Sequence, residues 1–328
     1  MTGVTVRVPA KLNLQLAVGP PRADGYHDLV TVFHAISLFD EVAVVPAGRD
    51  GVAVSGEGAD RVPADRDNLA LRAVAALRAA VPAGAAEPAG VHVTITKRIP
   101  VAAGLAGGSA DAAAALVACN ELWDCGLSQQ QLAEVGAKVG SDVAFAMLGG
   151  TAVGRGRGEL LTPALAPATQ YHWVLAFADG QLSTPEVYAT LDRLRAAQAA
   201  QAGDPPSPAR GGSARARSGK SRSPDLDAPL MSALRSGDAA LVGRTLSNDL
   251  QAAAVSLFPP LRKTLAAGLE LGALGALVAG SGPTCAFLAR SADRALDLAA
   301  SLSGAGVCRS VARVMGPVPG AAIVPSAK

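Results

Sequence analysis

A turn rich in glycine and alanine is the part of the chain best suited to chemistry. It runs from Pro100 to Ala110 and reads Pro-Val-Ala-Ala-Gly-Leu-Ala-Gly-Gly-Ser-Ala. A strand-like run at residues 91–97 leads into it, and an alanine-rich helical pattern at residues 109–122 leads out. Small side chains let backbone N–H groups face outward, and a helix start adds unpaired N–H groups and a positive dipole end. Because such an arrangement binds phosphate, the sequence predicts a nucleotide site here.

Two other phosphate-binding motifs do not account for this turn. A P-loop requires Gly-x-x-x-x-Gly-Lys-Ser/Thr, and the nearest match ends in Gly219-Lys220-Ser221 with Ala214 in the place of the first glycine. A dinucleotide fingerprint requires Gly-x-Gly-x-x-Gly and an acidic residue about 20 positions later. The run that begins at Gly104 does not have that spacing.

Lys11 and Asn13 share one face of a predicted strand near the N-terminus. Residues 11–18 alternate, with leucines on the opposite face. The ordinary interpretation of Lys11 is a surface lysine on an edge strand. However, the chain has only six lysines and uses arginine elsewhere, so a lysine at this position indicates a need for a compact ammonium group.

Asp142 follows Gly140 and Ser141 at the predicted start of a short helix, residues 141–148. The residues alone leave two interpretations open. In the first, Ser141 is the N-cap and Asp142 interacts favourably with the helix dipole. In the second, the helix end keeps the Asp142 carboxylate ionised and available as a base.

Three further segments carry polar side chains at turns. The run Gly25-Tyr26-His27-Asp28 is typical of a turn that enters a strand. The run Gly280-Ser281-Gly282 is typical of a hairpin turn, which could also close over phosphate. Tyr188 follows Ser183-Thr184-Pro185 and by default packs into a core. Taken one at a time, these segments do not assign a function.

The bulk composition predicts a globular chain without a nucleic-acid-binding body. Half of the 328 residues are hydrophobic and 17% are charged, and this length favours two domains. Aromatic residues make up only 3%, which argues against a stacking surface for single-stranded nucleic acid. The net charge is +2, but residues 201–224 contribute +4, so the rest of the chain is close to neutral at −2.

The composition also indicates where in the cell the protein is expected. No run approaches the ~18 apolar residues of a membrane span, and residues 1–9 alternate like a strand and lack a signal-peptide core. The four cysteines show no Cys-x-x-Cys spacing and are expected to be reduced. We therefore expect a cytoplasmic protein without a membrane partner or a zinc site, either a monomer or a weak homodimer.

The elements that must position these residues mix strands and helices. Strands are expected at residues 4–8, 11–18, 29–45, 51–55, 91–97, 172–178, 274–279, 284–290 and 306–315. Helices are expected at residues 68–81 (capped by Asp67), 109–122, 128–140 (capped by Ser128), 141–148, from 185 onward, and at 226–236, 238–252, 259–271 and 291–303. A glycine-dense stretch places a domain boundary near 150–160. Residues 201–224 are rich in Pro, Gly, Ser and Arg and are expected to form a disordered insertion.

Taken in order, these segments resemble the GHMP kinases, the family of galactokinase and of homoserine, mevalonate and phosphomevalonate kinases. The order is Pro-Ala-Lys-Leu-Asn-Leu at 9–14, Arg-Ala-Asp-Gly-Tyr-His at 22–27, the turn at 100–110, Gly-Ser-Asp-Val at 140–143, and Gly-Ser-Gly at 280–282. The resemblance covers nearly the whole chain outside residues 201–224. It implies a two-lobed α+β fold. Residues 1–155 are expected to form an ATP-binding lobe like ribosomal protein S5 domain 2, and residues 156–328 a ferredoxin-like lobe.

The resemblance also implies roles for individual residues. Lys11 and Asp142 match the catalytic pair of the family, and Asn13 matches a substrate-site residue beside the lysine. ATP, accompanied by Mg²⁺ with no protein ligand assigned, is expected on the turn made of Pro100, Val101, Ala102, Ala103, Gly104, Leu105, Ala106, Gly107, Gly108, Ser109 and Ala110. Within the family, the segments at 9–14 and 22–27 favour a member whose small-molecule substrate carries a cytidyl group on an alcohol. Tyr26 and His27 match the residues that recognise cytosine, and Thr184 and Tyr188 match the opposite wall.

The chain departs from the family pattern in its turn, and alternatives stay open. Ala102, Ala103 and Ala106 replace common glycines, and alanine permits an N–H cradle where φ is negative. The alternatives are a homoserine- or mevalonate-type kinase and a non-catalytic nucleotide-binding sensor. A further one is nucleic-acid binding through residues 201–224, which predicts strong salt dependence.

Overall fold

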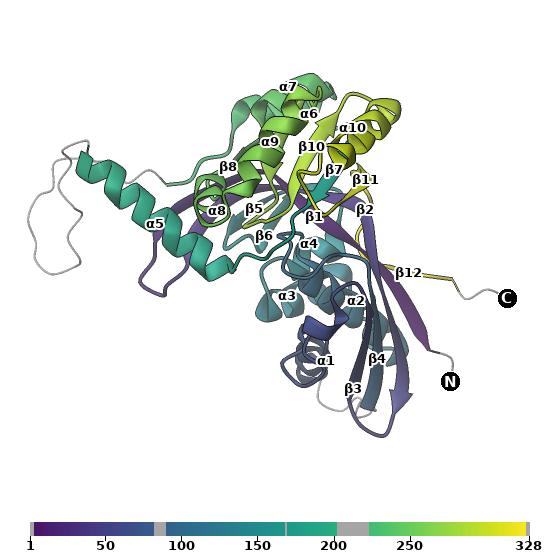
Figure 1. Cartoon of the computed structure of the whole chain (residues 1–328). Coiled ribbons are helices and arrows are strands. Elements are labelled where there is room, and N and C mark those ends of the chain that lie inside the picture. The colour runs from purple at the N-terminus through teal and green to yellow at the C-terminus, as the bar shows by residue number, and fades with distance from the viewer. Residues whose placement is uncertain (1–2, 82–89, 168, 202–222, 326–328) are drawn as a thin grey trace, which may run out of the picture.

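The computed structural model describes residues 3–81, 90–167, 169–201 and 223–325 (Figure 1). Its strands are β1 (Val4–Pro21), β2 (His27–Ala47), β3 (Gly51–Gly56), β4 (Gly90–Lys97), β5 (Thr151–Gly156), β6 (Leu160–Pro163), β7 (Tyr171–Phe177), β8 (Ser247–Asn248), β9 (Gly275–Val278), β10 (Cys285–Ala289), β11 (Ser310–Gly316) and β12 (Ala322–Ile323). Its helices are α1 (Leu69–Ala80), α2 (Gly107–Leu122), α3 (Gln129–Val139), α4 (Val143–Leu148), α5 (Thr184–Gln201), α6 (Ala228–Ser236), α7 (Ala239–Thr245), α8 (Gln251–Leu257), α9 (Pro260–Glu270) and α10 (Ala292–Gly304), with a short 3-10 helix at Ala59–Arg61.

The first sheet is built around a long antiparallel hairpin of β1 and β2. Its strand order is β12-β1-β2-β4-β3, while β5 also pairs with β2, β6 with β5 and β8 with β1. The register between β1 and β2 shifts at Pro9/Ala10 and again at Asn13/Gln15. Such bulges bend a strand and re-aim its side chains, and here they flank the segment that carries Lys11.

Helix α2 lies at the centre of the first lobe. It packs on β1 and β2, and α1, α3 and α4 pack around it in the lower part of Figure 1. Residues 112–116 of α2, four alanines and a leucine, are fully buried. The small alanine side chains let neighbouring backbones approach this helix from several sides, so α2 is a rigid support for the turn at its N-terminus.

The second sheet is antiparallel, with the order β11-β7-β10-β9. One of its faces packs against α5, α8, α9 and α10 through residues such as Val187, Ala254 and Leu298. The other face contributes Trp173 and Leu288 to the same hydrophobic core that fills the first lobe. The two-lobed α+β architecture predicted from the sequence is confirmed, and the two lobes share one core.

Several element boundaries differ from the prediction. The single helix expected at 238–252 is two helices, α7 and α8, separated by β8, which pairs with β1. Helix α2 begins at Gly107, earlier than expected. The cap of α1 is Asn68, whose side chain accepts from the Ala70 N–H, so the assignment of Asp67 is wrong.

Two expectations about chain organisation concern residues 150–224. Strands β5 and β6 belong to the first sheet, so that sheet continues to Pro163; the division into 1–155 and 156–328 remains a prediction. The insertion expected at 201–224 lies almost wholly outside the described residues. Among the helices that the structure does describe, a bilayer-spanning one is absent.

Candidate active site

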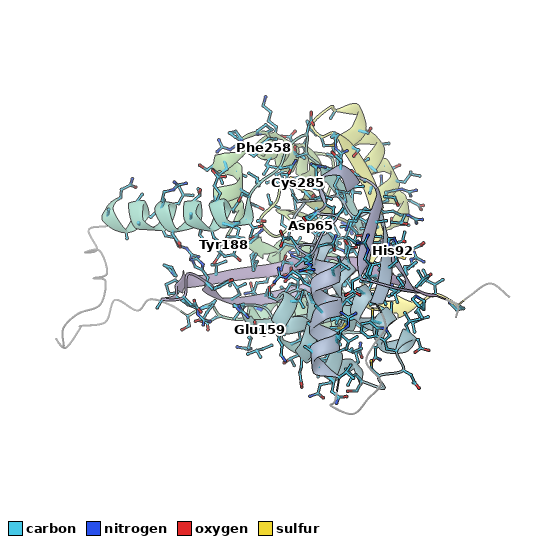
Figure 2. The ribbon with its side chains drawn as sticks, turned by 90° about the horizontal axis from the view of Figure 1, so that it is seen from below. Asp65, His92, Glu159, Tyr188, Phe258 and Cys285 are labelled. Carbon is cyan, nitrogen blue, oxygen red and sulfur yellow. The ribbon has the colours of Figure 1, made fainter. Side chains whose placement is uncertain are left out.

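A cleft of about 1140 Å³ collects most of the predicted site residues. Lys11, Asn13, Tyr26 and His27 line it from β1, β2 and the turn between them, and Asp142 lines it from the start of α4. Thr184 and Tyr188 line it from α5, and Figure 2 shows Tyr188 on the side of α5 that faces β1 and β2. Of the predicted turn, the residues that line the cleft are Pro100, Val101, Ala102, Ala103, Gly104, Ala106, Gly107 and Gly108. Leu105, Ser109 and Ala110 are not among the lining residues, and Leu105 and Ala110 are buried in the core.

The turn at 100–110 requires its glycine at 104. Gly104 has φ +77°, and a Cβ there would lie 2.0 Å from the carbonyl oxygen of Ala279. The second glycine turn therefore closes against the first, because Gly280 has φ +53° and a Cβ there would lie 2.8 Å from the carbonyl oxygen of Gly104. Any side chain at either position would push the two turns apart.

Two alanines of this turn adopt a conformation that glycine usually provides. Ala102 has φ +55° and Ala106 has φ +60°, so the condition of negative φ, under which alanine permits an N–H cradle, is not met at either position. Left-handed backbone costs an alanine ~1–2 kcal/mol. Ala106 is the N-cap of α2 and makes no side-chain cap hydrogen bond, so the first N–H groups of α2 are left without that partner.

A buried ionic network that sequence reasoning missed ties the two ends of the turn together. The Lys97 ammonium, at the end of β4, donates to Asp40 Oδ2 at 2.5 Å and to Asp111 Oδ2, in the first turns of α2, at 2.7 Å. Asp40 Oδ1 also accepts from the backbone N–H groups of Arg98 and Ile99. A lone acid in an alanine run and a rare lysine just before the turn were the available signals.

Burial controls the charges of this network. It raises the pKa of the Asp111 carboxyl to about 8, against the opposing effect of Lys97. For Lys97, burial alone would lower the pKa, but Asp111 and Asp40 more than offset it, and the pKa is raised. The ammonium therefore stays charged beneath the turn, where a Cβ on Gly107 would lie 3.1 Å from its Nζ.

Lys11 and Asp142 meet inside the cleft. Lys11 Nζ lies 3.7 Å from Asp142 Oδ2 and donates to Asn13 Oδ1 at 2.7 Å. Asn13 in turn donates to Thr31 Oγ1 at 2.8 Å. The Lys11 side chain is 9% exposed and that of Asp142 is 26% exposed. Burial lowers the pKa of the Lys11 ammonium, and the nearby Asp142 carboxylate partly offsets this effect.

The position of Asp142 corrects the first of the two interpretations of its segment. Asp142 itself is the N-cap of α4, and its side chain makes no cap hydrogen bond. The assignment of Ser141 as N-cap is therefore wrong. The carboxylate of Asp142 is directed to Lys11, so it is available to a molecule bound in the cleft.

The opposite wall of the cleft is one face of α5. Thr184, Tyr188 and Asp192 recur every fourth residue and so share that face. Thr184 Oγ1 bonds Ser281 Oγ at 2.8 Å, which joins α5 to the second glycine turn. The Tyr188 and His27 rings lie 5.0 Å apart, tilted by 37°. Burial raises the pKa of the Tyr188 hydroxyl, and Asp142 adds to the effect.

Tyr26 lies at the rim of the cleft. It is 55% exposed, and the guanidinium of Arg157 lies 5.1 Å from its ring centroid. Among the described residues, the Tyr26 ring therefore contacts the Arg157 guanidinium, whereas the Tyr188 ring contacts the His27 ring. The cleft brings both tyrosines together without direct ring contact between them.

The cleft also has lining residues that no sequence pattern indicated. They lie before and at the start of α1 and include Arg61, Val62, Asn68 and Leu69. Within the described residues, no group of three or more His, Cys, Asp or Glu side chains could hold a metal ion.

Comparison with known proteins assigns a family. The N-terminal domain pattern of the GHMP kinases matches residues 68–150, and the C-terminal pattern matches residues 230–308. The chain is 56% identical to the 4-diphosphocytidyl-2-C-methyl-D-erythritol kinase of Nocardia farcinica, over 98% of this chain and 96% of that protein. It is 52% identical to the protein of the same name from Thermobifida fusca, over 98% and 99% of the two chains.

Solved structures agree with this assignment. A crystal structure of 4-(cytidine 5'-diphospho)-2C-methyl-D-erythritol kinase matches with a TM-score of 0.70 and 32% identity, over 95% of this chain and 99% of that one. A homoserine kinase from Cytophaga hutchinsonii matches with a TM-score of 0.71 but only 20% identity, over 99% and 98% of the two chains, and supports the fold alone. Fold, cleft and full-length similarity agree, and the chain belongs to the GHMP kinase family, among its 4-diphosphocytidyl-2-C-methyl-D-erythritol kinases.

Proposed function

We propose that this chain transfers the γ-phosphoryl group of ATP to the C2 hydroxyl of 4-diphosphocytidyl-2-C-methyl-D-erythritol. The products are the 2-phosphate and ADP, and the reaction belongs to non-mevalonate isoprenoid precursor biosynthesis. The observation that carries the proposal is the approach of Lys11 Nζ to Asp142 Oδ2 at 3.7 Å, in a cleft bordered by the turn at 100–110. The names of the relatives indicate the same substrate.

ATP fits the residues that are present. The close approach at Gly104 and Gly280, the backbone of Gly107 and Gly108 and the start of α2 form a cradle of main-chain groups. Mg²⁺ would accompany the phosphates and neutralise part of their charge. No protein ligand for Mg²⁺ is assigned, and the protein's own contribution to the transfer comes from its side chains.

Lys11 and Asp142 have complementary tasks in this proposal. Phosphoryl transfer depends mainly on positioning and on charge stabilisation. Asp142 orients the tertiary hydroxyl and accepts its proton late, when the oxygen has become acidic. Lys11 pairs with the Asp142 carboxylate and offsets negative charge on the moving phosphoryl group, and its ammonium donates a hydrogen bond to Asn13 at 2.7 Å.

The cytidyl end of the substrate is assigned to the other end of the cleft. Tyr26 and Tyr188 would enclose the cytosine, a stack worth about 0.5–1.5 kcal/mol beyond the buried area. His27 would read the polar edge of the base. Thr184, bonded to Ser281, would belong with Tyr188 to the wall opposite Tyr26 and His27.

A coupled assay of ADP release tests the function directly. Purified protein is given ATP and Mg²⁺ with the cytidyl substrate, homoserine or mevalonate in parallel. We expect turnover with the cytidyl substrate to exceed that with either other alcohol by several orders of magnitude. Preference for homoserine or mevalonate would reassign the chain within its family, and ATP binding without turnover of any alcohol would favour a nucleotide sensor.

A further inference from the structure

His27 has a carboxylate partner that the proposed function does not use. His27 Nε2 lies 3.1 Å from Asp192 Oδ1 and 3.2 Å from Asp192 Oδ2. The histidine side chain is 6% exposed and that of Asp192 is 32% exposed. His27 begins β2 and Asp192 lies on α5, so this contact joins the two walls of the cleft.

The contact determines which nitrogen of a neutral His27 carries the proton. A carboxylate only accepts hydrogen bonds, whereas a neutral imidazole has one donor nitrogen and one acceptor nitrogen. Nε2 is therefore the donor to Asp192, and Nδ1 is left as an acceptor. In the part of the chain that the structure describes, Nδ1 has no hydrogen-bond partner, and His27 lines the cleft.

An acceptor at this point distinguishes the two pyrimidines. Cytosine presents a 4-amino donor, whereas uracil presents a carbonyl oxygen at the same position. An unprotonated Nδ1 accepts a hydrogen bond from the amino group of cytosine and repels the carbonyl oxygen of uracil. We propose that Asp192 is a positioning residue that fixes the tautomer of His27 and thereby makes the chain select a cytidine substrate over its uridine analogue. This inference rests on the proposed function, because it concerns the base that His27 reads.

Helix α5 offers a matched control for the test. Asp192→Asn keeps the size of the side chain but supplies both an acceptor and a donor, so either tautomer of His27 is satisfied. Glu186→Gln removes the same charge from an exposed position on α5 that does not line the cleft. Both variants are compared with the wild type on 4-diphosphocytidyl-2-C-methyl-D-erythritol and on its uridine analogue.

We expect kcat/KM for the cytidine substrate to fall about tenfold in Asp192→Asn, the value of one hydrogen bond. The kcat/KM for the uridine analogue should be unchanged or higher, and the KM for ATP unchanged. Glu186→Gln should keep the wild-type preference. In a His27→Ala background, Asp192→Asn should have no further effect on the ratio, because the two residues act as a unit. An equal fall for both substrates, or a shifted ratio without His27, would overturn the inference.

A spectroscopic measurement separates this inference from the proposed function. The chain has only four histidines, so ¹⁵N spectra of histidine-labelled protein, compared with His27→Ala, identify the His27 signals. We expect a protonated Nε2 and an unprotonated Nδ1 in the wild type, and a mixture of tautomers in Asp192→Asn. A protonated Nδ1 in neutral wild-type His27 would refute the inference even if the kinase is active. Conversely, an inactive wild type with the expected spectrum would refute the proposed function alone.

Discussion

Asp142 is an N-cap residue that does not cap. Carboxylates in this position normally accept from the N–H groups of the first helical turn, but Asp142 makes no such bond and lies 3.7 Å from Lys11 instead. Helix α4 therefore lacks the stabilisation that a side-chain cap at Asp142 would give its first N–H groups. Because the Asp142 carboxylate does not cap the helix, its oxygens are available to a bound substrate.

Replacing this carboxylate tests its role at the residue scale. Asp142→Asn keeps the shape but removes the base, so we expect kcat to fall about 10²–10⁴-fold, with ATP affinity retained. Steady-state kinetics and nucleotide titration measure the two quantities. Asp297→Asn, on the exposed face of α10, is the control and should behave as the wild type. Near-normal turnover of Asp142→Asn would remove Asp142 from catalysis.

At the scale of elements, one ionic network couples β2, β4 and α2. Asp40, Lys97 and Asp111 come from these three elements and surround the entry and exit of the turn at 100–110. The Oδ1 atom of Asp111 is buried and has no hydrogen-bond partner among the residues that the structure describes. Because removing Lys97 would leave the buried Asp40 carboxylate without its cationic partner, substitution of Lys97 should cost more than substitution of a lysine in an exposed ion pair.

The raised pKa of Asp111 predicts a pH dependence of stability. Burial raises this pKa from 3.8 to about 8, so between about pH 4 and pH 8 the folded state binds a proton that the unfolded state has lost. The stabilisation linked to that proton is full below pH 4 and is lost as the pH rises toward 8.

Asp111→Asn removes this titration. We therefore expect the unfolding free energy of the variant to depend less steeply on pH between 5 and 8, as measured by urea denaturation. Glu121→Gln, an exposed acid on the same helix, should leave the wild-type slope intact. An unchanged slope in Asp111→Asn would show that Asp111 is ionised in the folded state throughout this range.

Local signals predicted the elements better than the contacts between them. The Ser128 cap of α3 was predicted and is confirmed, with Gln131 completing a capping box. The N-cap of α1 is Asn68 and not the predicted, adjacent Asp67. Two neighbouring residues of equal capping strength cannot be separated by residue type alone. The pairs His27–Asp192 and Asp40–Lys97 join residues far apart in sequence, and nothing in the local pattern around either member indicates its partner.

For the candidate site too, the sequence indicated which residues take part better than how they are arranged. Order and spacing along the chain, through the resemblance to a family, predicted Lys11, Asp142 and the turn at 100–110, and the structure brings these together in one cleft. The conformations of Ala102 and Ala106 were not predictable. A positive φ at alanine depends on the surrounding packing, which overrides the preference of the residue.

At the scale of the whole molecule, the shared core predicts a single unfolding unit. Trp173 is fully buried and belongs to the core that also contains Leu12, Val32 and Leu116 of the first lobe. We expect calorimetry to show one cooperative transition. Trp173→Ala should lower the unfolding free energy of the whole chain by about 3–5 kcal/mol and move the single transition to a lower temperature. Two separate transitions, with only the second-lobe one displaced by the substitution, would contradict a common core.

The common core also limits how ligands enter. Cleft walls carried by independent domains can swing apart about a hinge. Here the α5 wall packs through Val187 and Leu191 into one buried cluster with Leu16 and Val18 of β1, and such close-packed side chains resist deformation. Tyr26, by contrast, is 55% exposed at the rim, and its ring contacts the Arg157 guanidinium. We therefore expect the nucleotide-linked alcohol to enter and leave past the side chains at the mouth of the cleft, without the two lobes moving apart.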